Sequence, residues 1–146
     1  MAKRFIIGID LGGTNLKIAL LDLNYEIRCK QIYDTGRFIK KDSLIAAIVA
    51  SVNKIIQSKK LSKINILGIG LGLPGPIDAQ KGLVHFFPNI PGWKEVNLKD
   101  ILERKLGIPV YLDNDANLMA LAEYRLGAAR GVRNAVCLTL GTGVGG

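Results

Sequence analysis

Two short segments of this chain carry residues whose types and spacing suit chemistry on a phosphate. In the first, Asp10 is followed, after one leucine, by Gly12, Gly13 and Thr14. Glycines can adopt positive φ and leave room for a ligand, and successive N–H groups of such a turn form an anion-binding concavity. A carboxylate beside a phosphate repels it unless a cation lies between them, so Asp10 indicates a magnesium-nucleotide site. The alternative is a hairpin turn that uses glycines for geometry alone, and spacing does not separate the two.

The second segment is Asp113-Asn114-Asp115, where an apolar strand pattern ends and a helix pattern begins. Ligands of open α/β sheets gather at the carboxyl ends of strands. A carboxylate of Asp115 at the helix N-terminus would be held in its charged form by the helix dipole. Phosphoryl transfer needs such a group to orient a hydroxyl and accept its proton. The alternative, that Asp115 or Asn114 only caps the helix, is favoured when this segment is taken alone.

A third segment, between the other two, is rich in aromatic residues and prolines. Asn89, Gly92 and Trp93 would offer amide hydrogen bonds and an apolar wall to a sugar, whereas a tryptophan that packs the loop onto the core is the alternative. His85 is the only histidine, and without partners of ligand type it indicates a surface or loop residue and no metal site.

The apolar pattern predicts the elements that must position these segments. Strands are expected at 4–10, 16–22, 26–33, 64–73, 109–112 and 135–140, with a small hairpin at 77–84. Helices are expected at 43–58, from Asn97 to Gly107, and after 113–117, the last with an apolar face of Leu118, Met119, Ala122 and Leu126. Because a helical crossover precedes 64–73, that strand should lie parallel in the centre of the sheet. The order predicts an α/β fold, a mixed five-stranded sheet with helices on both faces.

Composition bounds the class of protein. A chain of 146 residues, 49% hydrophobic with 22% charged residues, predicts one globular domain without a signal peptide or membrane span. Cys29 and Cys137 lie far apart in apolar contexts, which is typical of free thiols in the cytoplasm. The net charge of +8 comes from scattered lysines and arginines, so no nucleic-acid partner is expected.

Two stretches, 70–75 and 141–146, match the dinucleotide-binding pattern G-x-G-x-x-G, but neither is followed directly by a helix, which disfavours an oxidoreductase. The chain stops inside the second of these loops, which predicts a fragment cut at the entry to a further domain. Strand 135–140, left without its natural partner, is expected to pair with a second copy of the chain.

Four stretches together resemble the ROK family of bacterial sugar kinases and repressors, within the actin-like, ribonuclease-H-like ATPase superfamily. They are GIDLGGT at 8–14, GLGLPGPID at 70–78, LDNDAN at 112–117 and LTLGTGVGG at 138–146. They occur in the family's order, and the resemblance extends over the whole chain.

The resemblance implies two phosphate-binding loops that face each other across a cleft, and Mg²⁺ near Asp10. The first loop would consist of Asp10, Gly12, Gly13 and Thr14. The second would contain Gly141, Thr142 and Gly143.

The resemblance also implies roles toward the sugar. Asp115 matches the family's catalytic base, which activates the hydroxyl that attacks the γ-phosphate of ATP. Asn114 and Asn89 match ligands of the sugar hydroxyls, and Gly75 would line the sugar pocket.

Residues 1–133 are therefore expected to form the N-terminal lobe of an ATP-dependent kinase of hexoses or N-acetylhexosamines. Residues 134–146 would be the first strand and phosphate loop of a truncated second lobe, so the chain alone should be inactive. In the family the second lobe carries most adenosine contacts and a structural zinc. One alternative is the sugar-sensing domain of a ROK repressor without catalysis, although this chain begins at the first strand without a helix-turn-helix. Another is an acetate-kinase-like or chaperone-like ATPase of the same superfamily.

Overall fold

The computed structural model describes residues 3–38, 40–87, 90–140 and 144–146. Asn89 and the loop residues 141–143 therefore lie outside the described residues, and their expected roles stay predictions. The helices are α1 (Lys41–Ser58), α2 (Leu98–Leu106) and α3 (Asp115–Leu126), with short 3₁₀ turns η1 (Thr35–Arg37) and η2 (Lys63–Asn65). The strands are β1 (Phe5–Leu11), β2 (Asn15–Asp22), β3 (Ile27–Asp34), β4 (Ile66–Leu73), β5 (Ile77–Asp78), β6 (Leu83–Phe86), β7 (Lys94–Asn97), β8 (Val110–Asn114), β9 (Thr139–Leu140) and β10 (Val144–Gly145).

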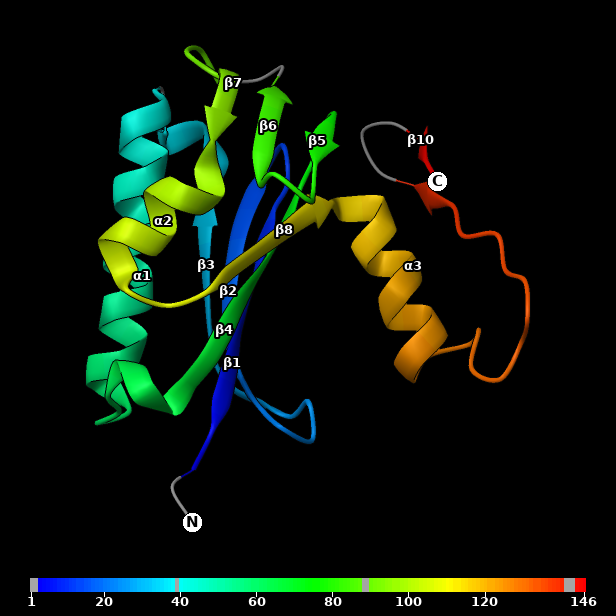
Figure 1. The fold of residues 1–146 in the computed structure, drawn as a ribbon, viewed down its shortest axis with the longest axis horizontal. Helices are drawn as coiled ribbons and strands as arrows, with labels where there is room; N and C mark the ends of the chain where they lie inside the picture. Colours follow the sequence, from blue (N-terminus) through cyan, green and yellow to red (C-terminus); the bar gives the residue numbers. More distant parts are fainter. Residues whose placement is uncertain (1–2, 39, 88–89, 141–143) are drawn as a thin grey trace.

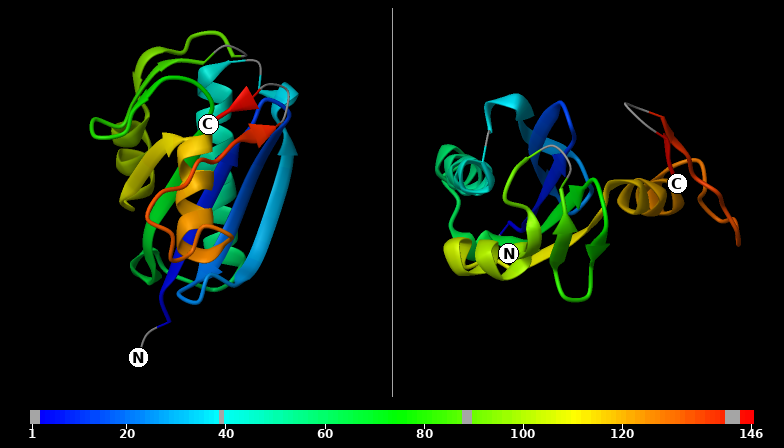
Figure 2. Two further views of the ribbon diagram at one scale, coloured as in Figure 1. Left: turned by 90° about the vertical axis from the view of Figure 1, so that its right-hand side faces the viewer. Right: turned by 90° about the horizontal axis from the view of Figure 1, so that it is seen from above.

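The main sheet has five strands in the order β3-β2-β1-β4-β8. Strands β1, β2 and β3 form an antiparallel meander, and β4 and β8 run parallel to β1. Helices α1 and α2 cover one face of this sheet, and α3 lies on the other side (Figures 1 and 2). The predicted mixed five-stranded sheet with helices on both faces is confirmed.

One face of the sheet is the core face. Alternate residues of β1, namely Ile7, Ile9 and Leu11, are buried and lie in register with buried aliphatic residues of β2. Helix α1 presents a stripe to the same core, and its buried apolar members are Leu44, Ile45, Ile48, Val52, Ile55 and Ile56. This stripe recurs at the helical period, so the sequence alone was sufficient to place it.

The opposite face is built of small residues in its centre. Gly8 of β1 pairs in register with Gly70 of β4, and Gly72 follows two residues later on the same face. A Cβ atom at Gly72 would lie 3.4 Å from Cδ1 of Leu118 and 3.7 Å from Cα of Asp115. Glycine at this position therefore lets the first turn of α3 approach the sheet backbone.

Helix α2 is capped as predicted and is tied to β8 by Glu103. Asn97 Oδ1 accepts a hydrogen bond from the Asp100 amide, and Gly107 ends the helix with φ of 66°. One carboxylate oxygen of Glu103 accepts from the Val110 amide at 2.8 Å, and the other accepts from Lys99 Nζ at 2.7 Å. The Lys99 ammonium and the Val110 amide lower the pKa of Glu103 below its ordinary value of 4.5. Glu103 thus fixes the start of the strand that leads to Asp115.

The variant Glu103→Gln is expected to lower the free energy of unfolding by about 1 kcal/mol at pH 7. Because folding lowers the pKa of Glu103, its contribution is complete above pH 4.5 and is lost as the pH falls through the folded-state pKa. Urea unfolding at pH 7 and at pH 3 should therefore show a difference from wild type that shrinks at the lower pH. The control is Glu26→Gln, whose carboxylate pairs with Arg28 in solvent and should contribute little. A difference that stays constant with pH would contradict the argument.

Several predicted elements differ from the structure: α1 begins two residues earlier than expected, at Lys41, and β8 extends two residues further, to Asn114. Strand β4 begins at Ile66, two residues later than expected, because η2 occupies 63–65. The strand expected at 135–140 is only Thr139–Leu140, which pairs with β10 and leaves Leu140 82% exposed. The apolar face expected on α3 is half-buried at Leu118 and exposed at Leu126 (54%), and β4 and β8 are the strands that contact this helix most. None of the helices in the described ranges is long and apolar enough to cross a membrane.

Candidate active site

The two sequence segments that suit phosphate chemistry meet at one edge of the sheet. Because β1, β4 and β8 are parallel, their carboxyl ends lie side by side, and Asp10, Gly72 and Asp113 are in register across them. Residues in register on neighbouring strands share a face of the sheet. Two strand spacings separate the backbones of Asp10 and Asp113 by roughly 10 Å. The glycine between them has no side chain of its own, and the Leu118 side chain at the start of α3 packs over it.

Asp10 projects from the end of β1 on the face opposite the core. Its carboxylate oxygen lies 2.9 Å from Nζ of Lys17, the residue opposite it on β2. The two side chains are 52% and 44% exposed, so the pair is accessible to solvent and to ligands. Asp10 is therefore available to a cation that competes with, or joins, the Lys17 ammonium.

The turn at 12–14 connects β1 to β2. The Gly12 amide donates to the Asn15 carbonyl at 2.8 Å, and a Cβ at Gly12 would lie 3.4 Å from that oxygen. Neither Gly12 nor Gly13 belongs to the glycines with positive φ, so the turn does not use the freedom that glycine has to adopt it. Gly12 is half-buried, while Gly13 and Thr14 are exposed.

Helix α3 begins at Asp115, and its cap is Asn114. Asn114 Oδ1 accepts from the amides of Ala116 at 2.9 Å and Asn117 at 3.4 Å. Of the two residues proposed as the cap, only Asn114 therefore takes that position. Asp115 follows it with a half-buried side chain whose Oδ1 accepts from the adjacent Ala116 amide. Its second carboxylate oxygen has no partner among the described residues.

Gly75 lies against this helix start. Asn114 Nδ2 donates to the Gly75 carbonyl at 3.2 Å, so the residue after β4 and the end of β8 are joined. Gly75 has φ of 99°, and a Cβ there would lie 2.9 Å from the Phe86 carbonyl oxygen. Both the backbone conformation and the contact require glycine at this position. The structure thus places Gly75 and Asn114, both predicted to contact substrate, in direct contact.

The aromatic segment is arranged as the alternative interpretation expected. Trp93 is only 3% exposed, belongs to the core and packs against Phe87 with ring centroids 5.7 Å apart. It fills the interior and is no exposed wall for a sugar. His85 lies on β6 with Nδ1 2.9 Å from Glu95 Oε1, which agrees with a surface residue.

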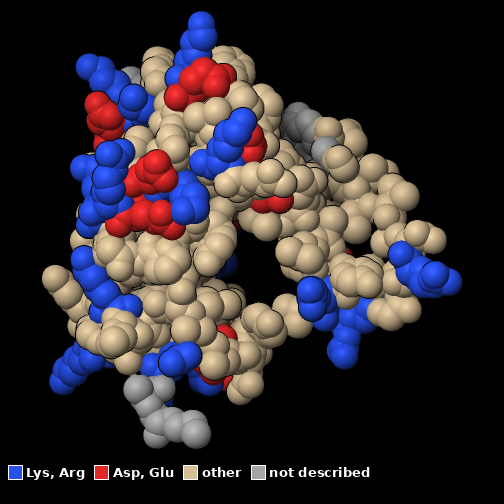
Figure 3. Space-filling model, viewed as in Figure 1, with Lys and Arg blue, Asp and Glu red and all other residues tan. Residues whose placement is uncertain are grey.

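Asp10 and Asp115 open onto the same side of the sheet. The Cα of Asp115 lies over Gly72, on the face that Asp10 also occupies, and at the same edge. Figure 3 shows a separate hollow in the surface below β8, between the lower part of the sheet and α3. The two carboxylates that the sequence singled out are therefore brought together by the fold.

Thr35 is a functional candidate that the sequence analysis missed. It lies just after β3, and its side chain is 3% exposed. Its hydroxyl donates to the Gly12 carbonyl at 3.0 Å, and its amide donates to the Thr14 carbonyl at 2.9 Å. No local pattern marks a threonine that contacts a turn more than twenty residues away.

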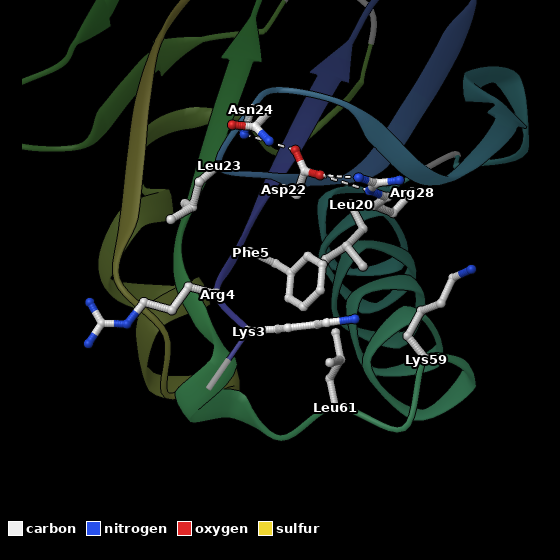
Figure 4. A pocket seen from close by; sticks show the side chains of 10 residues that line it. All are labelled: Lys3, Arg4, Phe5, Leu20, Asp22, Leu23, Asn24, Arg28, Lys59 and Leu61. Carbon is white, nitrogen blue, oxygen red and sulfur yellow. Dashed lines mark hydrogen bonds and ion pairs between the residues drawn. The ribbon is translucent and has the colours of Figure 1, made fainter. Parts of the chain in front are cut away.

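A separate pocket of ≈ 630 Å³ lies at the other end of the sheet, around the amino end of β1 (Figure 4). Phe5, Leu20 and Leu61 give it apolar walls, and none of the predicted site residues lines it. Its one carboxylate, Asp22, faces the Arg28 guanidinium, which lowers the pKa of Asp22 despite some desolvation. Because that carboxylate is already paired, the pocket holds no group placed for acid–base chemistry.

A magnesium nucleotide fits the residues at the candidate site. Within the described ranges, no group of three or more His, Cys, Asp and Glu side chains is arranged to hold a metal by itself. Mg²⁺ commonly binds one or two carboxylates together with phosphate oxygens and waters. A single accessible carboxylate, Asp10, beside an exposed turn matches that mode of binding.

The fold and this site define a class of protein. A meander followed by two parallel strands, with an acidic residue at the end of β1, is the ribonuclease-H-like lobe of actin-like ATPases. The match to the ROK family extends over residues 6–146. This chain belongs to the ROK family.

Similar proteins within this family include kinases and repressors. A glucokinase of Halalkalibacterium halodurans is 40% identical over 146 residues, which are all of this chain and 44% of that protein. A xylose repressor of Caldicellulosiruptor bescii is 34% identical over 96% of this chain and 35% of its own length. The structure of a ROK family glucokinase from Streptomyces griseus, in complex with glucose and AMPPNP, is similar with a TM-score of 0.83 and 34% identity, over 97% of this chain and 43% of that one. The chain thus spans less than half the length of these relatives.

Proposed function

We propose that this chain is the N-terminal lobe of an ATP-dependent sugar kinase. The observation that carries the proposal is the alignment of Asp10, Gly72 and Asp113 at one edge of the sheet, with Asp115 on the same side. Similarity to a glucokinase bound to glucose and AMPPNP supports ATP and a hexose as substrates. The similarity to a putative N-acetylmannosamine kinase from Listeria monocytogenes, 30% identical with a TM-score of 0.78, supports the wider range of sugars.

In this proposal the nucleotide phosphates bind at the turn formed by Gly12, Gly13 and Thr14. The amides of Gly13 and Thr14, in the exposed part of the turn, would supply N–H donors, and Asp10 would hold Mg²⁺, which would neutralise phosphate charge. Gly141, Thr142 and Gly143 would supply the facing loop.

Asp115 is the proposed catalytic base. Its carboxylate lies in the first turn of α3, where the helix dipole favours negative charge. It accepts the proton of the sugar hydroxyl while that oxygen bonds to the γ-phosphorus and ADP leaves. Asn114 and Gly75, joined by their hydrogen bond, would position the sugar beside Asp115, together with Asn89.

The domain boundaries are part of the proposal. Residues 1–133 would form this lobe, and 134–146 would begin a second lobe that completes the site and holds the structural zinc. Leu140 and Val144 of β9 and β10 are exposed, which supports the proposal that the second lobe covers them in the longer protein. When the 146-residue chain is alone, a second copy of it would pair at this strand.

The test uses the natural full-length protein and the 146-residue chain side by side. Each is mixed with ATP, Mg²⁺ and a panel of hexoses and N-acetylhexosamines, and ADP release is followed. We expect sugar-dependent ADP release from the full-length protein and none from the short chain. ADP release that does not depend on any sugar, or that depends on acetate, would instead identify another ATPase of the superfamily.

A non-catalytic sugar sensor is the second candidate, because the xylose repressor of C. bescii matches 96% of this chain. It predicts that the full-length protein binds a sugar, measured by calorimetry, without ADP release. That result would exclude the kinase.

A further inference from the structure

We infer that Thr35 is a positioning residue for the phosphate-binding turn at 12–14, and that its hydroxyl sets the affinity for the nucleotide. This inference rests on the proposed function. Thr35 has no contact with a phosphate in the proposal; it acts through the backbone of the turn.

Two hydrogen bonds join Thr35 to the two ends of the turn. The Thr35 amide donates to the Thr14 carbonyl at 2.9 Å, at one end of the turn. The Thr35 hydroxyl donates to the Gly12 carbonyl at 3.0 Å, at the other end. One residue therefore fixes both ends of the turn, and the directions of the amides between them depend on it.

Thr35 is buried beneath an exposed part of the turn. The residue is 3% exposed, whereas Gly13 and Thr14 are exposed. A buried hydroxyl that loses its partner is costly, so its hydrogen bond to Gly12 should persist in the folded state. The turn thus has a rigid, buried support beneath a surface that is open to ligands.

Thr35 is itself held in place by the residues around it. Asp34, at the end of β3, accepts a hydrogen bond from the Gly36 amide at 2.8 Å and so caps η1. A Cβ at Gly36 would lie 3.2 Å from that Asp34 oxygen, so a glycine there favours the capped arrangement. Strand β3 pairs with β2 up to Asp34, opposite Asn15. The support of the turn is therefore continuous with the sheet.

An anion-binding turn is effective when its N–H groups already point at the ligand, because the nucleotide then does not have to order the backbone. Loss of the Thr35 hydroxyl should leave the turn in place through the remaining amide bond but allow the Gly12 end to move. The consequence is weaker nucleotide binding with the sugar site unchanged.

The experiment compares Thr35→Val, which removes the hydroxyl at nearly constant volume, with Thr35→Ser, which retains it. In the natural full-length protein, Thr35→Val is expected to raise the Kd for Mg²⁺·AMPPNP about tenfold, the equivalent of one hydrogen bond, with the Kd for sugar and kcat nearly unchanged. Thr35→Ser should bind the nucleotide like the wild type. Hydrogen exchange without ligand should be faster at the Gly12 amide in Thr35→Val only.

Ser51→Ala is the matched control, because Ser51 is the other buried polar residue within the described ranges and lies in α1, away from the turn. Equal nucleotide affinity in Thr35→Val and wild type would overturn the inference, as would equal losses in Thr35→Val and Thr35→Ser. If the wild type itself binds no nucleotide, the proposed function fails and the inference fails with it. That result is distinguishable because it appears before any substitution is made.

Discussion

If the proposed function holds, replacement of Asp115 by asparagine is expected to lower kcat of the full-length protein by about 10²–10⁴-fold, with the Kd for sugar nearly unchanged. Asparagine has the same shape and keeps an oxygen that can accept from the Ala116 amide, as Asp115 Oδ1 does at 2.9 Å. The start of α3 should therefore stay intact. What asparagine cannot do is take up the proton of the attacking hydroxyl.

The matched control is Asp100→Asn, in the first turn of α2, where the carboxylate lies outside the candidate site. Single-turnover kinetics separate the phosphoryl-transfer step from product release, and calorimetry gives the affinity for sugar. A kcat near wild type in Asp115→Asn would remove Asp115 from the role of base. A large loss of sugar affinity with kcat retained would instead assign it to substrate binding.

Most of the helices and strands could be predicted from the sequence because the patterns that define them lie within a few neighbouring residues. The stripe of α1, the cap at Asn97 and the left-handed glycine at Gly107 each depend on neighbours within a few residues. The prediction of a strand at 135–140 was too long. An apolar run shows only that a segment can form a strand, whereas the length of the strand depends on the partner with which it pairs. Among the described residues only β10 offers one, and it reaches only Thr139 and Leu140.

The part of the candidate site that depends on the order and direction of the strands could be predicted from the sequence. Asp10 and Asp115 could be linked because parallel strands bring their carboxyl ends to one edge of a sheet. The support by Thr35 could not be predicted, since it joins residues that are distant in the chain through hydrogen bonds to the backbone. Likewise, the pattern around Trp93 was compatible with a sugar-binding wall and with a core residue, and only its burial decided between them.

Replacement of Asp10 by asparagine is expected to weaken binding of Mg²⁺·AMPPNP and to lower kcat/KM for ATP by roughly two orders of magnitude. The Asp10 carboxylate pairs with Lys17 at 2.9 Å in solvent, and exposed ion pairs contribute at most about 1 kcal/mol to stability. Urea unfolding of the variant should therefore resemble that of the wild type, so that the loss of binding cannot be assigned to unfolding.

Asp10 has two possible tasks, and a double-mutant cycle with Lys17→Met separates them. If Asp10 holds the cation, Asp10→Asn should weaken Mg²⁺·AMPPNP binding by the same factor whether residue 17 is lysine or methionine, apart from a minor term for the lost ion pair. If Asp10 serves only to neutralise the Lys17 ammonium, Lys17→Met should restore most of the binding that Asp10→Asn removes. Titration of Mg²⁺ at fixed AMPPNP gives a further readout, because only the first task predicts that Asp10→Asn raises the magnesium concentration required for half-maximal binding. We expect that result, since Asp10 lies beside an exposed turn at the edge where Asp115 also lies.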